Sequence, residues 1–211
     1  MTESVARIWG RGHRSARCPE CRLVCAQCIC QAITPLSVRT RVVLVVHRNE
    51  RLKSSNTARL AARLLAGSAL VVRGLRSDER DGDGSDDVPT GRRLLLFPGS
   101  HARELTRADA DAPPGTNAEP PVLLVPDGSW SQARKLVQRD ALLVSGEPVR
   151  LPSVGSSRYR LRRNVRPGTL CTLEAVAAAL AILEGPEVEA TMLEAFETFQ
   201  RRSLELRCLP R

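Results

Sequence analysis

Arg41-Val-Val-Leu-Val-Val-His47 is a continuous run of apolar, mostly β-branched residues between two basic ends. Successive side chains of a strand point to opposite faces, so a strand without polar positions is buried on both faces, as in a parallel sheet. Asn56 or Thr57 can cap a following helix, in which leucines recur at helical spacing. A buried strand followed by an amphipathic helix favours an α/β protein.

Similar alternation continues along the rest of the chain. Further strands are expected at Ala69–Val72, Arg93–Phe97, Val122–Val125 and Val149–Leu151. Helices are expected over about Ser131–Gln138, Leu173–Leu183 and Val188–Leu206, and a short one can form near His101–Leu105. We therefore predict a mostly parallel sheet with helices on both faces.

Length and hydropathy set the class of protein. A chain of 211 residues suits one domain, or one domain with a small appendage. Its apolar runs are far too short to cross a bilayer, and its arginine-rich start lacks the apolar stretch of a secretory signal. We expect a cytoplasmic protein that does not associate with a membrane.

The formal net charge of +9 predicts a polyanionic partner, because clustered cations release counterions from phosphates. Basic residues concentrate in two segments: Met1–Leu60 has 11 Arg and Lys against 3 Glu, and Arg150–Leu170 has 6 Arg and no acid. The acidic stretch Asp78–Asp87 is typical of a solvated loop. A general preference for arginine would produce a similar total, so charge alone does not establish nucleic-acid binding.

Five of the seven cysteines fall within one short segment, with the spacing Cys18-Pro-Glu-Cys21, six residues, then Cys28-Ile-Cys30. Four thiolates in so short a loop can surround zinc tetrahedrally and hold a segment that has little core of its own. Cys25 lies within the spacer and could replace one ligand, and a group of reduced cysteines is the alternative interpretation. We predict a structural zinc ion on Cys18, Cys21, Cys28 and Cys30.

The expected strand Val122–Val125 runs directly into Pro126-Asp127-Gly128-Ser129-Trp130. Ligands of α/β proteins bind at the carboxyl ends of strands. An aspartate at such an end can act as a general base, and an aromatic residue beside it can stack on a nucleobase or a cofactor. The same residues also suit an ordinary Asp-Gly turn with a tryptophan in the core, so this segment alone does not decide between the two.

Four other segments accompany this turn: Ser55-Asn56-Thr57-Ala58-Arg59-Leu60, Phe97-Pro98-Gly99-Ser100, Tyr159-Arg160-Leu161-Arg162-Arg163 and Leu170-Cys171-Thr172-Leu173-Glu174-Ala175. Their order and spacing, together with the cysteine cluster, resemble the DTW-domain family of tRNA-uridine aminocarboxypropyltransferases. The resemblance extends from about Arg17 to Leu206. The family's name triplet has Thr where Ser129 stands here, and the retained hydroxyl leads us to expect the same role.

The resemblance implies an enzyme that uses S-adenosylmethionine and is related to the SPOUT class, in which the C-terminal half is typically threaded into a trefoil knot. Asp127, Ser129 and Trp130 are the implied catalytic residues, with Asp127 as the base that removes the proton from uridine N3. The cofactor would lie on loops at several strand ends. The implied cofactor-binding residues are Phe97, Pro98, Gly99, Ser100, Leu170, Cys171, Thr172 and Glu174.

The resemblance also implies tRNA as the partner. Residues 1–38 would form a basic N-terminal zinc module, and residues 39–211 would form the transferase domain. The candidate RNA-binding residues are Arg39, Arg41, Arg134, Lys135, Arg158, Tyr159, Arg160, Arg162 and Arg163. Two other functions remain open at this point: a SPOUT-type RNA methyltransferase and a zinc-containing RNA-binding protein without catalysis. The sequence leaves the oligomeric state and the modified uridine undetermined.

Overall fold

The computed structural model describes residues 16–74, 89–111, 119–153, 155–161 and 168–208. The acidic stretch Asp78–Asp87 lies outside the described residues.

The core of the fold is a six-stranded sheet with the order β2-β1-β5-β3-β6-β4, in which every neighbouring pair of strands is parallel. The strands are β1 (Arg41–His47), β2 (Ala69–Arg73), β3 (Arg93–Leu96), β4 (Arg103–Glu104), β5 (Val122–Asp127) and β6 (Glu147–Arg150). β1 and β5 are neighbouring interior strands, and their apolar runs are buried on both faces. The predicted parallel sheet is confirmed.

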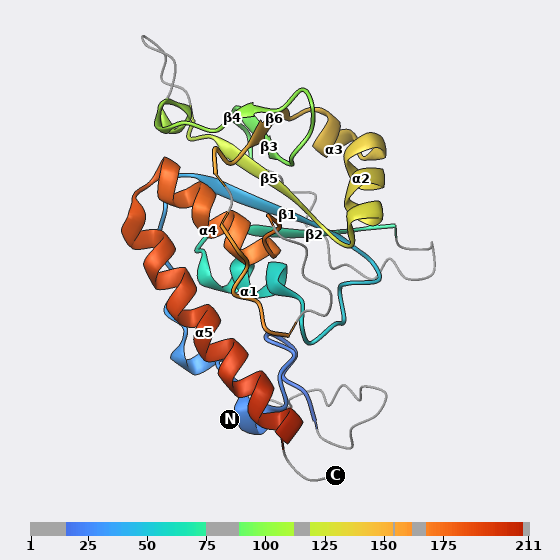
Figure 1. Ribbon diagram of the computed structural model, residues 1–211, viewed down its shortest axis with the longest axis vertical. Helices are drawn as coiled ribbons and strands as arrows, with labels where there is room; N and C mark the ends of the chain where they lie inside the picture. The colour runs from blue at the N-terminus through green and yellow to red at the C-terminus, as the bar shows by residue number, and fades with distance from the viewer. Residues whose placement is uncertain (1–15, 75–88, 112–118, 154, 162–167, 209–211) are drawn as a thin grey trace.

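Helices cover both faces of the sheet (Figure 1). They are α1 (Thr57–Leu64), α2 (Trp130–Arg139), α3 (Ala141–Val144), α4 (Thr172–Leu183) and α5 (Pro186–Cys208), with short 3-10 turns η1 (Cys25–Gln27), η2 (Cys30–Ala32) and η4 (Arg107–Ala110). Alternate residues of β1 point to opposite faces of the sheet. Val42, Leu44 and Val46 belong to the apolar core beneath α1, α4 and α5. Val43 and Val45 pack instead with Leu136 and Leu143 of α2 and α3. None of the helices in the described part of the chain is both long and apolar enough to span a membrane.

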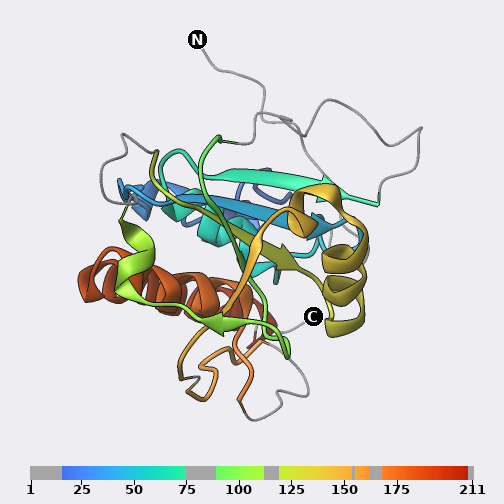
Figure 2. The ribbon, with the colours of Figure 1, turned by 90° about the horizontal axis from the view of Figure 1, so that it is seen from above.

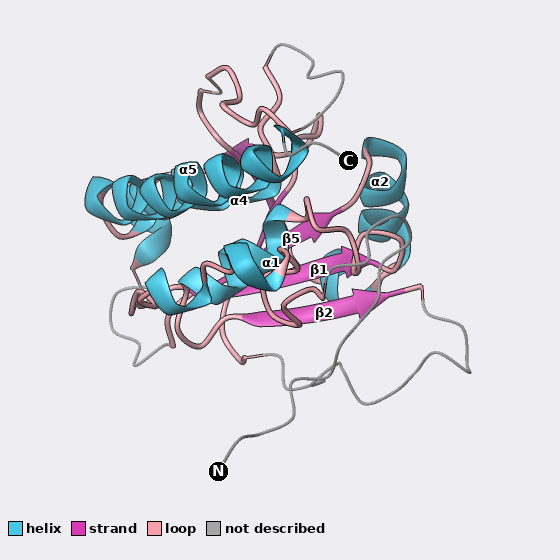
Figure 3. Cartoon of the chain, turned by 90° about the horizontal axis from the view of Figure 1, so that it is seen from below, coloured by secondary structure: helices cyan, strands magenta, loops and turns pink. Residues whose placement is uncertain are grey.

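The path of the chain opens a crevice at the carboxyl ends of β1 and β5. The chain leaves β1 for α1 on one face of the sheet and leaves β5 for α2 on the other face. Because β1 and β5 are parallel neighbours, their carboxyl ends separate two diverging connections, which is the position where α/β sheets bind ligands. Figure 3 shows the arrowheads of β1 and β5 at the same edge, beside the start of α2.

The prediction of a short helix near His101–Leu105 is wrong. The backbone there is extended and forms β4, which pairs with β6 through Arg103 and Glu104. Leu105 N donates to the carbonyl of Arg150 at 2.8 Å. The pairing partner is more than 40 residues away in the sequence, so local helix propensity could not reveal it.

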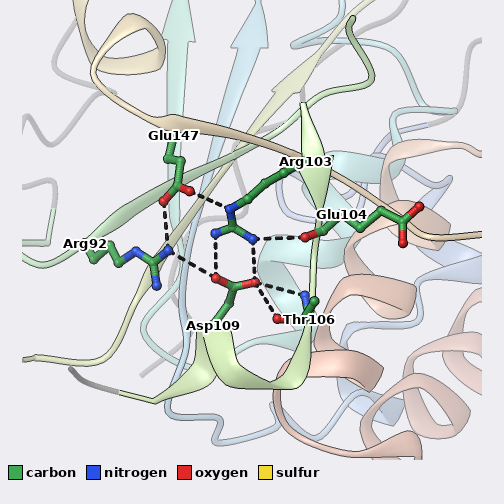
Figure 4. A network of polar contacts seen from close by, with 6 residues as sticks. All are labelled: Arg92, Arg103, Glu104, Thr106, Asp109 and Glu147. Carbon is green, nitrogen blue, oxygen red and sulfur yellow. Dashed lines mark hydrogen bonds and ion pairs between the residues drawn. The ribbon is translucent and has the colours of Figure 1, made fainter. Parts of the chain in front are cut away.

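A network of charged residues holds this edge of the sheet (Figure 4). The Asp109 carboxylate accepts hydrogen bonds from both terminal nitrogens of Arg103, at 2.9 and 2.6 Å, and from Arg92 at 3.1 Å. Glu147 of β6 accepts from the same two arginines, at 2.5 and 2.8 Å. The network therefore ties β4 and η4 to β6.

A trefoil knot in the C-terminal half stays a prediction.

Candidate active site and cysteine cluster

A cavity of about 410 Å³ opens at the carboxyl ends of β1, β5 and β3. Its walls come from five parts of the chain: residues 50, 53 and 55–57 after β1, residues 96–98 at the end of β3, residues 125–130 and 133 around the end of β5, residues 159 and 161, and residues 170–172 and 175 at the start of α4. Segments far apart in the sequence therefore meet here, as the order of strands and helices requires.

Asp127 is the last residue of β5 and lies beside Val46 in the register of the sheet. Only 6% of its surface is exposed. One carboxylate oxygen accepts a hydrogen bond from Thr172 Oγ1 at 2.5 Å, and the other accepts one from Asn56 Nδ2 at 2.6 Å. Both donors are neutral, so among the described residues the carboxylate is held in place by hydrogen bonds and not by direct contact with a cation.

The two donors are positioned by helix starts. Asn56 is the N-cap of α1, where its Oδ1 accepts from Arg59 N at 2.8 Å and its amide nitrogen remains to bind Asp127. Thr172 is the first residue of α4. Two helix N-termini thus face one carboxylate, an arrangement that favours negative charge.

The environment of Asp127 raises the pKa of its carboxyl above the ordinary value. Burial is the largest cause, since it disfavours the charged form, and the hydrogen bonds from Thr172 and Asn56 offset only part of it. Among nearby charges, Glu50 raises this pKa and Lys53 lowers it. A carboxylate with a raised pKa is a stronger base than an exposed aspartate, which suits proton removal.

Two of the aromatic rings that line the cavity, those of Phe97 and Trp130, lie close together. Trp130 is the first residue of α2, is 37% exposed and lies with its ring centroid 5.9 Å from that of Phe97, tilted by 56°. Ser129 also lines the cavity, and as the N-cap of α2 its hydroxyl accepts from Gln132 N. The Asp-Gly-Ser-Trp turn therefore both starts a helix and forms a wall of the cavity, which the sequence alone had left undecided.

The residues predicted to bind a cofactor divide into two groups. Phe97, Pro98, Leu170, Cys171 and Thr172 line the cavity. Gly99 and Ser100 are exposed and do not belong to its lining, and neither does Glu174. The buried Glu174 carboxylate instead accepts from Ser157 Oγ and Arg158 N, both at 2.6 Å, and from Cys171 N at 2.8 Å. Its contacts hold residues 155–161 against the start of α4.

Six of the residues predicted to contact RNA are exposed: Arg39, Arg41, Arg134, Lys135, Arg158 and Arg160. Tyr159 is only 6% exposed. Its hydroxyl donates to the carbonyl of Ser55 at 2.5 Å, and its ring lies 5.4 Å from that of Phe196. The structure thus places Tyr159 in the cavity wall and leaves little of its ring open for stacking. Arg162 and Arg163 lie outside the described residues.

Three functional candidates were missed. Glu50 and Lys53 line the cavity, although the segment between the first strand and its helix carried no motif that pointed to them. Asn56 was considered only as a helix cap, whereas its amide also binds Asp127. The one available signal was the resemblance of residues 55–60 to a family motif, which assigned no contact to Asn56.

The four predicted zinc ligands converge. The sulfur atoms of Cys18, Cys21, Cys28 and Cys30 all lie within 4.8 Å of one another. The Sγ–Sγ distances are 3.8 Å for Cys18 and Cys30 and 3.7 Å for Cys21 and Cys28. Tetrahedral zinc with Zn–S bonds of about 2.3 Å requires sulfurs about 3.8 Å apart, so this set fits the ion. Cys25 is exposed and lies outside this group of four.

The cysteine segment is packed onto the main body of the protein. Cys18, Cys21, Leu23 and Ile29 belong to the same apolar core as α4 and α5. Figure 1 shows this segment, in blue, beside the C-terminal part of α5, in red, where Arg202 donates to the carbonyl of Cys28 at 3.5 Å. The division at residue 38 stays a prediction, but the cluster shares its core with the sheet and helices. In Figure 2, α5 is seen in red from above, and its apolar residues belong to this shared core.

Comparisons with known proteins agree with this architecture. The family model described as DTW domain matches residues 15–204. The chain is 30% identical over 190 residues to tRNA-uridine aminocarboxypropyltransferase 2 of Macaca fascicularis, covering 86% of this chain and 62% of that protein. It is also 30% identical over 199 residues to the protein of the same name from Drosophila melanogaster, covering 92% and 77%. The chain thus spans somewhat less than two thirds of the macaque relative.

A solved structure confirms the fold. The SAM-dependent rRNA:acp-transferase Tsr3 from Vulcanisaeta distributa matches with a TM-score of 0.51 and 21% sequence identity, over 81% of this chain and 80% of that one.

Proposed function

The chain belongs to the DTW-domain family, and from this premise we propose that it is a tRNA-uridine aminocarboxypropyltransferase that uses S-adenosylmethionine. The observation that carries the proposal is Asp127, a buried carboxylate at a strand end, inside a cavity, with a raised pKa and two neutral hydrogen-bond donors. The names of the relatives supply the substrate class and the transferred group.

The reaction forms a bond between uridine N3 and the γ-carbon of the methionine moiety and breaks the bond from that carbon to sulfur, so that methylthioadenosine leaves. S-adenosylmethionine supplies the electrophilic carbon and a leaving group that is already activated as a sulfonium. N3 carries a proton and becomes a good nucleophile only when that proton is lost. Asp127 accepts the proton, because it is the one buried carboxylate that the described cavity wall presents without a cation in contact.

The hydrogen bonds of Asp127 suit this role. A carboxylate can accept about four hydrogen bonds, and Asn56 and Thr172 occupy one position on each oxygen. The group is therefore fixed in orientation while lone pairs remain to accept a proton. Holding the base and its substrate in one geometry contributes much of the rate of such reactions.

The remaining residues have supporting roles in this proposal. Phe97 and Trp130 offer apolar and aromatic surface for the adenosyl group, and the segment Leu170–Thr172 offers backbone groups beside Asp127. The four clustered cysteines hold a zinc ion that stabilises the N-terminal segment. The exposed basic residues Arg134, Lys135 and Arg158 would contact phosphates of the RNA.

The experiment that tests the function is an assay of purified protein with S-adenosylmethionine and either tRNA or rRNA transcripts. We expect mass spectrometry of digested tRNA to show aminocarboxypropyl-uridine, with methylthioadenosine as the second product. S-adenosylhomocysteine in its place would establish a methyltransferase. Product on rRNA alone would move the substrate class toward that named for the structural neighbour. Neither product on either RNA would contradict the proposal and favour a protein that only binds RNA.

A further inference from the structure

The connection between β1 and α1 brings every third residue to one side. Three backbone hydrogen bonds follow one another: Glu50 N to His47 O at 2.8 Å, Lys53 N to Glu50 O at 3.0 Å, and Asn56 N to Lys53 O at 3.1 Å. Successive turns of this type place side chains at i and i+3 above one another. Glu50, Lys53 and Asn56 all line the cavity that contains Asp127.

Glu50 and Lys53 are oppositely charged and in contact. Lys53 Nζ lies 2.6 Å from Glu50 Oε1. The Glu50 side chain is 15% exposed and that of Lys53 is 53% exposed, so the carboxylate lies inward and the ammonium near the mouth. Along the described lining of the cavity the charged residues are these two and Asp127.

An ion pair between neighbours on one turn is often a surface feature of little energetic value. Two observations distinguish this pair. Glu50 is largely buried, and a carboxylate is removed from water only where charge compensates it. In addition, both charges act on Asp127, since Glu50 raises and Lys53 lowers its pKa after the larger effect of burial. The pair and Asp127 therefore line one cavity and lie close enough for their charges to interact.

We propose that Lys53 and Glu50 form the subsite for the aminocarboxypropyl group itself, with Lys53 binding its α-carboxylate and Glu50 its α-ammonium. The inference rests on the proposed function and extends it to recognition of the transferred group. That group is a zwitterion with opposite charges on one carbon atom, and the subsite presents opposite charges 2.6 Å apart. Charge-assisted hydrogen bonds of this kind are the stronger ones in proteins.

This assignment explains how one cavity separates binding from chemistry. The α-carbon substituents would be bound by the segment after β1, whereas Asp127 at the end of β5 stays available for the proton of the RNA base. Anchoring the charged end of the group restricts the chain that contains the γ-carbon, which favours a reactive orientation.

Calorimetric titration with three compounds tests the subsite on the full chain. S-adenosylmethionine has both charges of the zwitterion, decarboxylated S-adenosylmethionine keeps only the ammonium, and methylthioadenosine lacks the whole chain. For the wild-type protein we expect affinity to fall by about tenfold on loss of the carboxylate and to fall further for methylthioadenosine.

Two variants test which residue binds the α-carboxylate and which binds the α-ammonium. Lys53→Met should weaken the binding of S-adenosylmethionine by about tenfold and leave the binding of decarboxylated S-adenosylmethionine nearly unchanged. The difference in affinity between the two compounds should therefore disappear. Glu50→Gln should weaken the binding of both of these compounds and leave the affinity for methylthioadenosine unchanged. The matched control is Arg139→Gln, which removes a charge from an exposed residue at the C-terminal end of α2, outside the cavity lining, and should change none of the three affinities.

A Lys53→Met protein that keeps the full preference for the carboxylate overturns the subsite, as does a uniform loss of affinity for all three compounds in the two variants. Thermal melting of each variant identifies any loss that comes from unfolding. The expected binding pattern without formation of aminocarboxypropyl-uridine would contradict the proposed function alone. Group transfer by a protein with the wrong binding pattern would contradict the subsite alone.

Discussion

Asp127 and Asp109 are buried to nearly the same degree, 6% and 4% exposed, yet the side chains that bind them differ in charge. Asp127 accepts hydrogen bonds from the neutral side chains of Asn56 and Thr172. Asp109 contacts the guanidinium groups of Arg103 and Arg92. Burial alone therefore does not determine how a carboxyl group titrates, because the charge of its partners decides whether its pKa is raised or lowered.

The pKa values of the two carboxyl groups are shifted in opposite directions. Burial raises the pKa of Asp127 more than its hydrogen bonds lower it. Burial also acts to raise the pKa of Asp109, but hydrogen bonds from Arg103 and Thr106 outweigh it and lower the pKa to about 2. Asp109 thus contributes stability above its ordinary pKa of 3.8, and this contribution is lost as the pH falls toward 2. Ionised Asp127 costs stability, and the cost begins as the pH rises above 3.8 toward its raised pKa.

Asp127→Asn should have the largest effect. The amide cannot accept the N3 proton, so transfer should fall by about 10²- to 10⁴-fold, the range of a general base. Release of methylthioadenosine measures the rate, and calorimetry should show that S-adenosylmethionine still binds. The melting temperature should not fall, because a desolvated charge has been replaced by a neutral group of similar shape. A fully active variant would remove Asp127 from the mechanism.

Asp109→Asn is the counterpart on the other side of the comparison. It removes the charge that both arginines contact, so we expect a loss of about 2 kcal/mol in the free energy of unfolding, moderated by the partial exposure of Arg103. Urea unfolding at pH 7 measures it, and the difference from wild type should shrink as the pH approaches 2. Transfer activity per folded molecule should be retained. Strong loss of activity without loss of stability would reverse the roles assigned to the two aspartates.

Thr172→Val removes one of the two donors to Asp127 at nearly constant volume. The hydrogen bond from Thr172 lowers the pKa of Asp127, so its loss should raise that pKa further. The acid limb of the profile of kcat/KM against pH should move to higher pH, so that the loss of activity is greatest on the acid side of the profile and shrinks as the pH rises. If Thr172 only supported the start of α4, activity would fall equally at every pH.

The cysteine cluster should influence neither aspartate directly. Cys18→Ser combined with Cys21→Ser should release one zinc ion per chain, measured by elemental analysis. We expect affinity for tRNA to fall by more than affinity for S-adenosylmethionine, which should stay within about twofold for the folded fraction, because neither serine lines the cavity. Wild-type protein that contains no zinc would contradict this prediction.

The sequence anticipated the elements that depend on local pattern. The apolar runs of β1 and β5, the N-cap Asn56 and the helical spacing of α4 and α5 all carry signals within a few residues. The expected helix at His101–Leu105 failed because Arg103 is held by Asp109 and by pairing with β6, contacts with distant parts of the chain. Glu50 and Lys53 were missed for the same reason, since only the folded connection brings them into the cavity that contains Asp127.

An α/β protein with a parallel sheet, a four-cysteine cluster and a strand-end aspartate can be predicted from the sequence alone, because hydrophobic periodicity, ligand spacing and turn-forming residues are all local features of the chain. Tertiary structure decided which side chains meet that aspartate and which meet Asp109. The pKa of a buried carboxyl depends on desolvation and on partners within a few ångströms, and those partners come together only when separate strands and helices pack.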